Sequence, residues 1–372
     1  MSQNPQRADL ISQIHQSDLR LSLAITGGGS KLVGELLVVP GASRTILDAN
    51  IPYSNEALQK FLGRKPQSYC SPETSKWMAV CRYFESLRLH ESEITAFACT
   101  AALATNRDRK GDHRFFTSIQ TRNASRLTQV TLAKGKRTRA EEEEMIVEVG
   151  LAELGRMINV DYQPAGWTDE DHLSNLNRIA SEEWSQVFHK QIPFCHATQS
   201  LSSPPNGIGL LSGSFNPLHA GHVEMAENFS KRYGVPTHFE LAIQNADKPP
   251  LDFLSIHGRV QQFDGHNLWL SNASTFVDKA ILFPGNMFIV GIDTITRIAD
   301  PKYYPGPDGL ERALDSIRQN DCRFVVFGRL EGTSFKTLSD VSLPSQLAAL
   351  CESVSEESFR KDISSTQLRG QL

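Results

Sequence analysis

Two segments of the chain share one pattern of hydrophobic and polar positions. Residues 21–25 and residues 208–211 are short apolar runs, and each is followed by a glycine-containing turn and a segment with helical spacing of apolar residues. Further apolar runs predict strands at residues 94–99, 128–133, 288–290 and 324–327. Because strands and helices alternate through both halves, we expect two α/β domains.

Two amphipathic segments predict helices over residues 137–158 and 168–190. We interpret the four glutamates at residues 141–144 as a solvated first turn favoured by the helix dipole, and not as a metal site. Residues 195–206 combine serine, proline and glycine without apolar periodicity, which indicates a linker or surface loop. We therefore expect domains over residues 1–165 and 206–372, joined by a helix and linker over residues 166–205.

Composition excludes several classes of protein. The chain has 372 residues, of which 40% are hydrophobic and 22% charged, values that are typical of a globular protein and not of a disordered chain. The formal charge of −4 provides no global positive field, so we expect neither nucleic acid nor a membrane surface as partner. Six cysteines without a CxxC pair indicate free thiols and no zinc site. With no signal peptide and no apolar run long enough to cross a bilayer, we expect a cytoplasmic location.

The most informative motif is GSFNPLHAGH at residues 213–222. Gly213 allows a tight turn in which backbone N–H groups approach a phosphate, and His219 and His222 lie three apart at a helix start, where both imidazoles can face one ligand. The window resembles the HxGH motif of the nucleotidylyltransferase superfamily. That resemblance implies a Rossmann-like domain with a parallel sheet, catalytic roles for both histidines, and ATP-binding positions at Gly213, Ser214, Phe215 and Asn216.

A second motif, ISSTQLR, occupies residues 363–369 and resembles the element that closes the ATP site in the same superfamily. Ser364, Ser365 and Thr366 are good N-cap residues, so their hydroxyls and the free N–H groups of a helix start could meet the β- and γ-phosphates. Arg369 would then offer a fixed cationic fork to the departing pyrophosphate, which makes it the third predicted catalytic residue.

Two weaker elements lie between these motifs. Lys248 and Arg259 resemble the substrate-side lysine and arginine of nicotinamide or nicotinate mononucleotide adenylyltransferases, although a solvated loop lysine is an equal alternative for Lys248. Gly291, Asp293 and Arg297 resemble the strand, GxD turn and helix that contact adenosine and ribose in that family.

The resemblance implies in-line attack by a mononucleotide phosphate oxygen on the α-phosphate of ATP, which yields a dinucleotide and pyrophosphate. Mg²⁺ would be the cofactor, held by ATP oxygens and water rather than by a protein metal site. No protein general base is needed, because the attacking phosphate is already ionised.

The first half carries three motifs: ITGGGS at residues 25–30, VPGAS at residues 39–43 and PYSNEA at residues 52–57. Together they resemble the CinA C-terminal domain, which is known for nicotinamide mononucleotide deamidase activity. The resemblance covers about residues 10 to 160 and places candidate site residues at Thr26, Gly27, Gly28, Tyr53 and Thr100.

Departures from that family change the expected chemistry. Thr26 stands where the family has its catalytic serine, Ile25 replaces a glutamate and Leu58 replaces a lysine, while Arg137 or Arg139 could replace a phosphate-binding arginine. These differences favour a retained fold that binds a nucleotide or mediates oligomerisation over an intact deamidase. We interpret the polar cluster at residues 110–114 as a charged hairpin turn, with a replacement site as the alternative.

The sequence therefore predicts an adenylyltransferase for nicotinamide or nicotinate mononucleotide in NAD biosynthesis, with a CinA-like first domain and homo-oligomeric assembly. Two alternatives stay open. The nucleotidyltransferase could use another phosphorylated acceptor, such as a phosphopantetheine-like or sugar-phosphate compound, or the chain could be a nucleotide sensor without catalytic activity.

Overall fold

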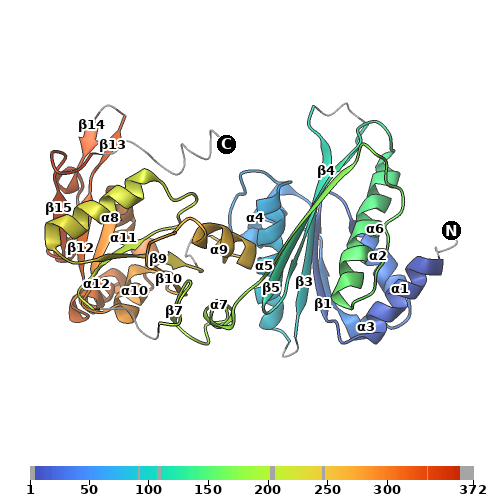
Figure 1. Ribbon diagram of the computed structural model, residues 1–372, viewed down its shortest axis with the longest axis horizontal. Helices are drawn as coiled ribbons and strands as arrows, with labels where there is room; N and C mark the ends of the chain where they lie inside the picture. Colours follow the sequence, from blue (N-terminus) through green and yellow to red (C-terminus); the bar gives the residue numbers. More distant parts are fainter. Residues whose placement is uncertain are drawn as a thin grey trace. The chain divides into compact units, whose positions relative to one another are not determined.

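The chain divides into two structural units, each built on its own sheet (Figure 1). The computed structural model describes residues 5–90, 93–106, 110–201, 206–244, 248–332 and 334–360. The first unit consists of residues 1–180 and 247–255, and the second of residues 181–246 and 256–372. Both units combine helices with a largely or partly parallel sheet, which confirms the expected α/β fold class.

The first unit holds a six-stranded sheet in the order β2-β1-β3-β4-β5-β6. Its strands are β1 (Leu21–Thr26), β2 (Ile46–Asn50), β3 (Thr95–Ala102), β4 (His113–Gln120), β5 (Ala124–Leu132) and β6 (His172–Ile179). The first strand pairs in parallel with β2 and β3, and the remaining pairs are antiparallel. Its helices are α1 (Pro5–Gln16), α2 (Ser30–Val38), α3 (Ala42–Thr45), α4 (Asn55–Leu62), α5 (Pro72–Leu87) and α6 (Arg139–Met157).

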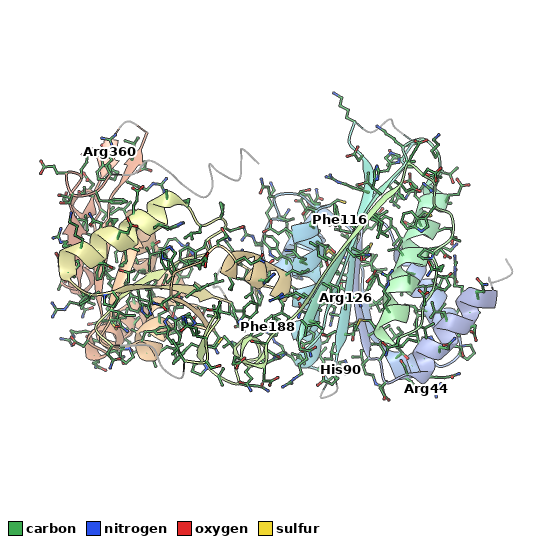
Figure 2. All side chains as sticks on the ribbon, viewed as in Figure 1. Arg44, His90, Phe116, Arg126, Phe188 and Arg360 are labelled. Carbon is green, nitrogen blue, oxygen red and sulfur yellow. The ribbon has the colours of Figure 1, made fainter. Side chains whose placement is uncertain are left out.

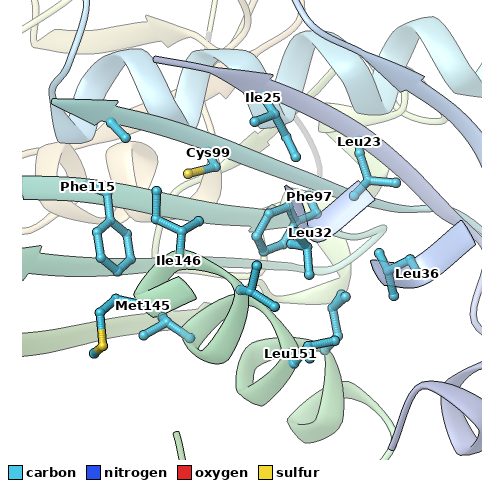
Figure 3. Packing of buried hydrophobic residues seen from close by; sticks show 14 of the residues in the cluster. Leu23, Ile25, Leu32, Leu36, Phe97, Cys99, Phe115, Met145, Ile146 and Leu151 are labelled. Carbon is cyan, nitrogen blue, oxygen red and sulfur yellow. The ribbon is translucent and has the colours of Figure 1, made fainter. Parts of the chain in front are cut away.

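Apolar side chains point alternately to the two faces of the sheet along β1, and a layer of helices covers each face (Figures 1 and 2). Leu23 and Ile25 pack with α1, α2 and α6 in the larger core, whose close packing Figure 3 shows, whereas Ala24 packs with α4 and α5 on the other face. The helix expected over residues 137–158 is confirmed as α6. It begins with a capping box, in which Thr138 and Glu141 satisfy each other's backbone N–H groups.

The helix expected over residues 168–190 is wrong for its first half. Residues 172–179 form β6, and only Glu182–Phe188 form a helix, α7, which Ser181 caps by accepting from the N–H of Trp184. Leu173, Leu176 and Ile179 recur at helical spacing, yet the free backbone edge of β5 offers this segment a full ladder of hydrogen bonds. Tertiary pairing therefore overrides the local pattern.

The second unit holds a seven-stranded sheet in the order β15-β12-β11-β8-β9-β10-β7. Its strands are β7 (Phe194–His196), β8 (Gly209–Ser212), β9 (Thr237–Ala242), β10 (Leu268–Ser271), β11 (Met287–Gly291), β12 (Arg323–Phe327) and β15 (Cys351–Val354), beside a hairpin of β13 (Arg329–Glu331) and β14 (Ser334–Lys336). All pairs in the large sheet are parallel except that of β7 with β10. The segment expected as helix and linker thus contributes β6 to one sheet and β7 to the other.

Helices of the second unit cover its sheet on both sides. They are α7, α8 (Ala220–Tyr233), α9 (Phe253–Val260), α10 (Phe276–Leu282), α11 (Ile292–Ile298), α12 (Gly309–Gln319) and α13 (Ser345–Ala348), with short 3₁₀ turns η1 (Pro301–Tyr303) and η2 (Leu338–Asp340). The first three residues of α9 belong to the first unit. Helices α10 to α12 pack against one core, which includes Trp269, while α8 contacts β8, β9 and β11. Among the described residues, no helix is long and apolar enough to cross a bilayer.

Candidate active site

The strand order of the second sheet reverses at one point, between β8 and β11. From β8 the chain first adds β9 and β10 on one side, then returns to add β11, β12 and β15 on the other, which is the 3-2-1-4-5-6 order of doubly wound nucleotide-binding sheets. The register pairs Ile289 with Leu211, and Gly291 and Gly213 each follow two residues further along the chain. Ligands bind such sheets at the carboxyl ends of the two strands where the order reverses.

The turn after β8 is held by its own backbone and by one aromatic ring. The N–H of Gly213 donates to the carbonyl of Glu240 over 3.0 Å. A Cβ at Gly213 would lie 2.8 Å from the buried ring of Phe215, which also packs edge-on against Phe239 and Phe263. Phe215 is thus a packing residue that shapes the predicted ATP-binding turn, while Ser214 is exposed at its tip.

His219 and His222 meet at the start of α8, as the motif predicted. His219 is the N-cap residue, and its N–H donates to Nδ1 of His222 over 3.3 Å. The two rings stack with centroids 3.8 Å apart, and the His222 ring also makes a T-shaped contact with the Phe215 ring, with centroids 5.1 Å apart. Because Nδ1 of His222 accepts this bond, its proton lies on Nε2, where it can be donated to a ligand.

Both histidines are held in their neutral form. Burial and the adjacent His219 lower the pKa of His222 to about 3, and burial lowers the pKa of His219. Among the described polar atoms, Nδ1 of His219 is buried without a hydrogen-bond partner. Two neutral imidazoles with ring nitrogens still available can donate to phosphate oxygens near neutral pH.

The lowered pKa of His222 predicts how stability depends on pH. An unfolded His222 takes up a proton near pH 6.5, whereas the folded one resists protonation down to about pH 3. Stability is therefore full above pH 6.5 and falls by a few kcal/mol as the pH drops through this window, because each pKa unit corresponds to ~1.4 kcal/mol. Denaturant unfolding of wild type and His222→Gln measures this slope.

The glutamine in that variant can still accept from the N–H of His219, so the cap is kept while the titrating ring is lost. Burial also lowers the pKa of His196 and His238, so wild type and variant share part of the slope and their difference isolates His222. The matched control is His172→Gln on the exposed strand β6. Identical slopes for His222→Gln and wild type would contradict the assignment.

Three of the other predicted nucleotide contacts, Gly291, Asp293 and Arg297, lie at the end of β11 and on α11. Gly291 caps α11 at the end of β11, beside the histidine turn, with open space where a Cβ would lie. Asp293 forms an exposed ion pair with Arg329. The Arg297 guanidinium lies 5.7 Å from the centre of the Tyr303 ring. Ser364, Ser365, Thr366 and Arg369 lie outside the described residues.

Lys248 and Arg259 are divided between the units. Lys248 is exposed in residues 247–255, which belong to the first unit, and Arg259 follows on α9 in the second. This segment is anchored by buried polar contacts: Asp252 lies 3.6 Å from the Lys76 ammonium, and the N–H of Phe253 donates to Ser125 over 2.9 Å. No local pattern predicts this placement, because the partners lie more than a hundred residues away along the chain.

A buried ion pair that no motif predicted joins β9 to α10. Both carboxylate oxygens of Glu240 accept from the Lys279 ammonium, at 2.7 and 2.6 Å, and Ser271 donates to the same carboxylate over 2.5 Å. The backbone of Glu240 also holds Gly213. The glutamate within the apolar run of β9 could have predicted this ion pair, because a charged side chain in a buried strand needs an oppositely charged partner.

In the first unit, two of the predicted deamidase residues donate their hydroxyl groups to backbone carbonyls of other residues in the unit. Thr26 donates its hydroxyl to the carbonyl of Pro52 over 2.9 Å, and Thr100, its neighbour in register, donates to the carbonyl of Tyr69 over 2.7 Å. Gly27 has a positive φ of 74°, and a Cβ there would lie 2.1 Å from the carbonyl oxygen of Ala101. Tyr53 is 66% exposed.

A carboxylate of this chain occupies the glycine turn of the first unit. Glu143 accepts from the N–H of Gly29 over 2.6 Å, where a phosphate-binding turn would offer that donor to a ligand. Arg139 donates to the carbonyl of Gly27 over 2.8 Å and lies 3.5 Å from Glu143. Of the two arginines considered for phosphate binding, Arg139 is at the turn, whereas Arg137 is bound to the buried Asp171.

The expectation of a solvated glutamate run at residues 141–144 holds for Glu141, which is exposed in the first turn of α6, but is wrong for the other three, whose carboxylates bind groups of the same unit. Glu142 is fully buried, accepts from the N–H of Ala104 and lies 2.6 Å from Nδ1 of His113. Glu144 pairs with Arg7 and Lys31. The predicted hairpin at residues 110–114 leads into β4, with His113 as its first, buried residue. No cluster of three or more metal-ligating side chains occurs in the described residues.

The second unit is a Rossmann-like domain with a neutral histidine pair at the start of α8, after the turn that follows β8. No protein-family model matches the sequence. Over 127 residues the chain is 32% identical to a Schizosaccharomyces pombe protein provisionally named as a nicotinamide mononucleotide adenylyltransferase, covering 30% of this chain and 48% of that protein. The chain thus spans about half the length of the curated relative it matches.

Solved structures similar to the chain include competence- or damage-inducible proteins of bacteria. CihA from Agrobacterium tumefaciens is 18% identical, with a TM-score of 0.35, over 43% of this chain and 98% of that one. A CinA superfamily protein from Enterobacter cloacae is 17% identical, with a TM-score of 0.36, over 42% and 95% of the two chains.

Proposed function

We propose that the second unit transfers the adenylyl group of ATP to nicotinamide or nicotinate mononucleotide. The observation that carries this proposal is the stacked pair of neutral histidines at the reversal point of a doubly wound sheet. The HxGH resemblance and the similarity to the S. pombe protein support the same reaction class.

In this proposal a phosphate oxygen of the mononucleotide forms a bond to the α-phosphorus of ATP. The bond from that phosphorus to the bridging oxygen breaks, and pyrophosphate leaves with the electron pair. Nε2–H of His222 donates to an α-phosphate oxygen as charge develops, and His219 lies within the same stack to donate beside it. Each neutral ring carries one N–H group, and donating it as a hydrogen bond transfers no proton to the substrate.

Mg²⁺ stays part of the proposal and would arrive with ATP, because its preferred ligands are phosphate oxygens and water. Arg369 and the hydroxyls of residues 364–366 are proposed to bind the β- and γ-phosphates. Lys248, Arg259, Asp293 and Arg297 are proposed contacts for the acceptor and the adenosine. We also propose that the protein is located in the cytoplasm.

The deciding experiment measures pyrophosphate release by the full chain with ATP and Mg²⁺ against four acceptors: nicotinamide mononucleotide, nicotinate mononucleotide, phosphopantetheine and a sugar phosphate. Release with either mononucleotide supports the proposal. Release only with another acceptor supports a different nucleotidyltransferase, and ATP binding without release supports a sensor.

For the first unit we propose a retained scaffold without deamidase activity, since its Thr26 hydroxyl and its glycine turn are both engaged within the unit. Ammonia release from nicotinamide mononucleotide should therefore be absent in wild type and unchanged in Thr26→Val, which keeps the side-chain shape and removes the hydroxyl. Measurable release that the substitution abolishes would identify Thr26 as a nucleophile and overturn this proposal.

A further inference from the structure

Strand β6 ends the first sheet with an unusually unprotected edge. It is eight residues long, and its side chains are mostly exposed, including Leu173 at 42%, Leu176 at 50% and Ile179 at 65%. Its inner neighbour is β5, which contains Arg126, labelled in Figure 2. The strand register pairs Arg126 with Asn177 of β6. Natural edge strands are usually short or guarded by charges and prolines, and this one has no proline or acidic residue.

The backbone of β6 indicates which residues face outward. The N–H of Ala180 donates to the carbonyl of Asn123, so this is a hydrogen-bonded pair of the antiparallel ladder with β5. Such pairs alternate along the strands. The even-numbered residues 172–178 therefore bond to β5, and the N–H and C=O groups of residues 173, 175, 177 and 179 point away from the sheet.

The sequence of β6 is complementary to itself in one antiparallel register. With a twofold axis at Leu176, Leu173 lies opposite Ile179 and Asn175 opposite Asn177, and every outward-pointing backbone group meets another. On the opposite face, Leu176 meets its own copy. Arg178 lies opposite Ser174, so no like charges meet.

The neighbouring registers pair apolar residues with polar ones. An axis at Asn175 sets Leu173 against Asn177 and brings His172 opposite Arg178. An axis at Asn177 sets Ile179 against Asn175 and Leu176 against Arg178. Only the axis at Leu176 matches apolar with apolar and polar with polar on both faces.

We propose that two copies of this chain pair antiparallel through β6, with a twofold axis at Leu176, and merge their first sheets into one continuous sheet. Such an interface is isologous, because the same strand contributes both sides. The pairing covers the exposed leucines and isoleucine and satisfies the outward backbone groups. It does not depend on the adenylyl-transfer proposal.

The test uses the meeting of residue 176 with its own copy. Leu176→Lys and Leu176→Glu each place like charges opposite one another, so each variant should be a monomer by size-exclusion chromatography with light scattering, with the dimer weakened at least roughly tenfold. An equimolar mixture of the two should restore the dimer, because lysine then meets glutamate. Wild type should be a dimer throughout.

The matched control is Leu89→Lys, which adds the same charge at another exposed leucine of this unit, 66% exposed, and should stay dimeric. A monomeric wild type, a dimer that survives Leu176→Lys, or a mixture that stays monomeric would each overturn the proposal. A mixture that stays monomeric is the result expected if β6 pairs with a strand of another protein or if the variants misfold, because mixing the two variants corrects neither.

Oxidative cross-linking gives an independent measure of the register. Directly opposite residues in a non-hydrogen-bonded pair have Cα atoms ~4.5 Å apart, within the range of a disulfide. Leu176→Cys should therefore form a covalent dimer. Asn175→Cys should not, because its own copy lies diagonally, ~7–8 Å away. Equal cross-linking of both variants would contradict the twofold axis at Leu176.

Discussion

Replacing His219 with alanine should lower kcat for adenylyl transfer by ~10²- to 10³-fold, the typical cost of removing one preorganised donor from a transition state. The Nδ1 atom of His219 has no hydrogen-bond partner among the described residues, so the substitution removes no side-chain hydrogen bond at that atom. Initial-rate measurements of pyrophosphate release, combined with equilibrium ATP binding, separate the loss of chemistry from the loss of affinity.

Two companion variants sharpen this prediction. His222→Gln keeps an acceptor for the N–H of His219 at the helix start but replaces the ring Nε2–H with an amide group at a different position. It should therefore also lose activity while α8 stays formed. His172→Ala, on the exposed strand β6, should retain wild-type rates. If His219→Ala retains activity within a fewfold of wild type, the histidine pair is not the catalytic centre.

Replacing Lys279 with methionine should destabilise the second unit by ~3–5 kcal/mol, because it leaves the Glu240 carboxylate buried without its cation. Glu240 is fully buried and Lys279 is 5% exposed, so water cannot easily replace the lost partner. Denaturant unfolding of the full chain, followed by a tryptophan signal from the buried Trp269, measures the change.

Two further variants test the physical cause. The double substitution Glu240→Gln with Lys279→Met removes both charges and should recover most of the lost stability. Lys302→Met breaks an exposed lysine–aspartate pair of the same unit and should leave the stability close to that of wild type, because solvent screens this pair. A double variant as unstable as Lys279→Met would show that packing, and not the uncompensated charge, causes the loss.

Local patterns predicted the elements of this chain well wherever the residues within one turn or strand determine them. The six strands expected from apolar runs all occur, and the two glycine turns follow β1 and β8 as expected. Gly27 is required where it stands, because a positive φ and the nearby carbonyl of Ala101 both exclude a side chain. The histidine pair likewise follows from a spacing of three at a helix start.

Interactions between distant segments could not be read in the same way. Residues 172–179 have helical spacing of apolar residues, and only the free edge of β5 makes them a strand. Glu143 looked like a solvated residue of a helix start, but the packing of α6 on the sheet carries it to Gly29, 114 residues away along the chain.

The sequence by itself determined two α/β units, their glycine turns and the histidine pair, because these depend on backbone sterics and on contacts within a few residues. The tertiary structure alone decided the electrostatic state of those residues. It buried His222 and thereby lowered its pKa, placed Lys279 against Glu240, and filled the first glycine turn with a carboxylate of the chain itself. Burial and long-range charge pairing exist only once the sheets have formed.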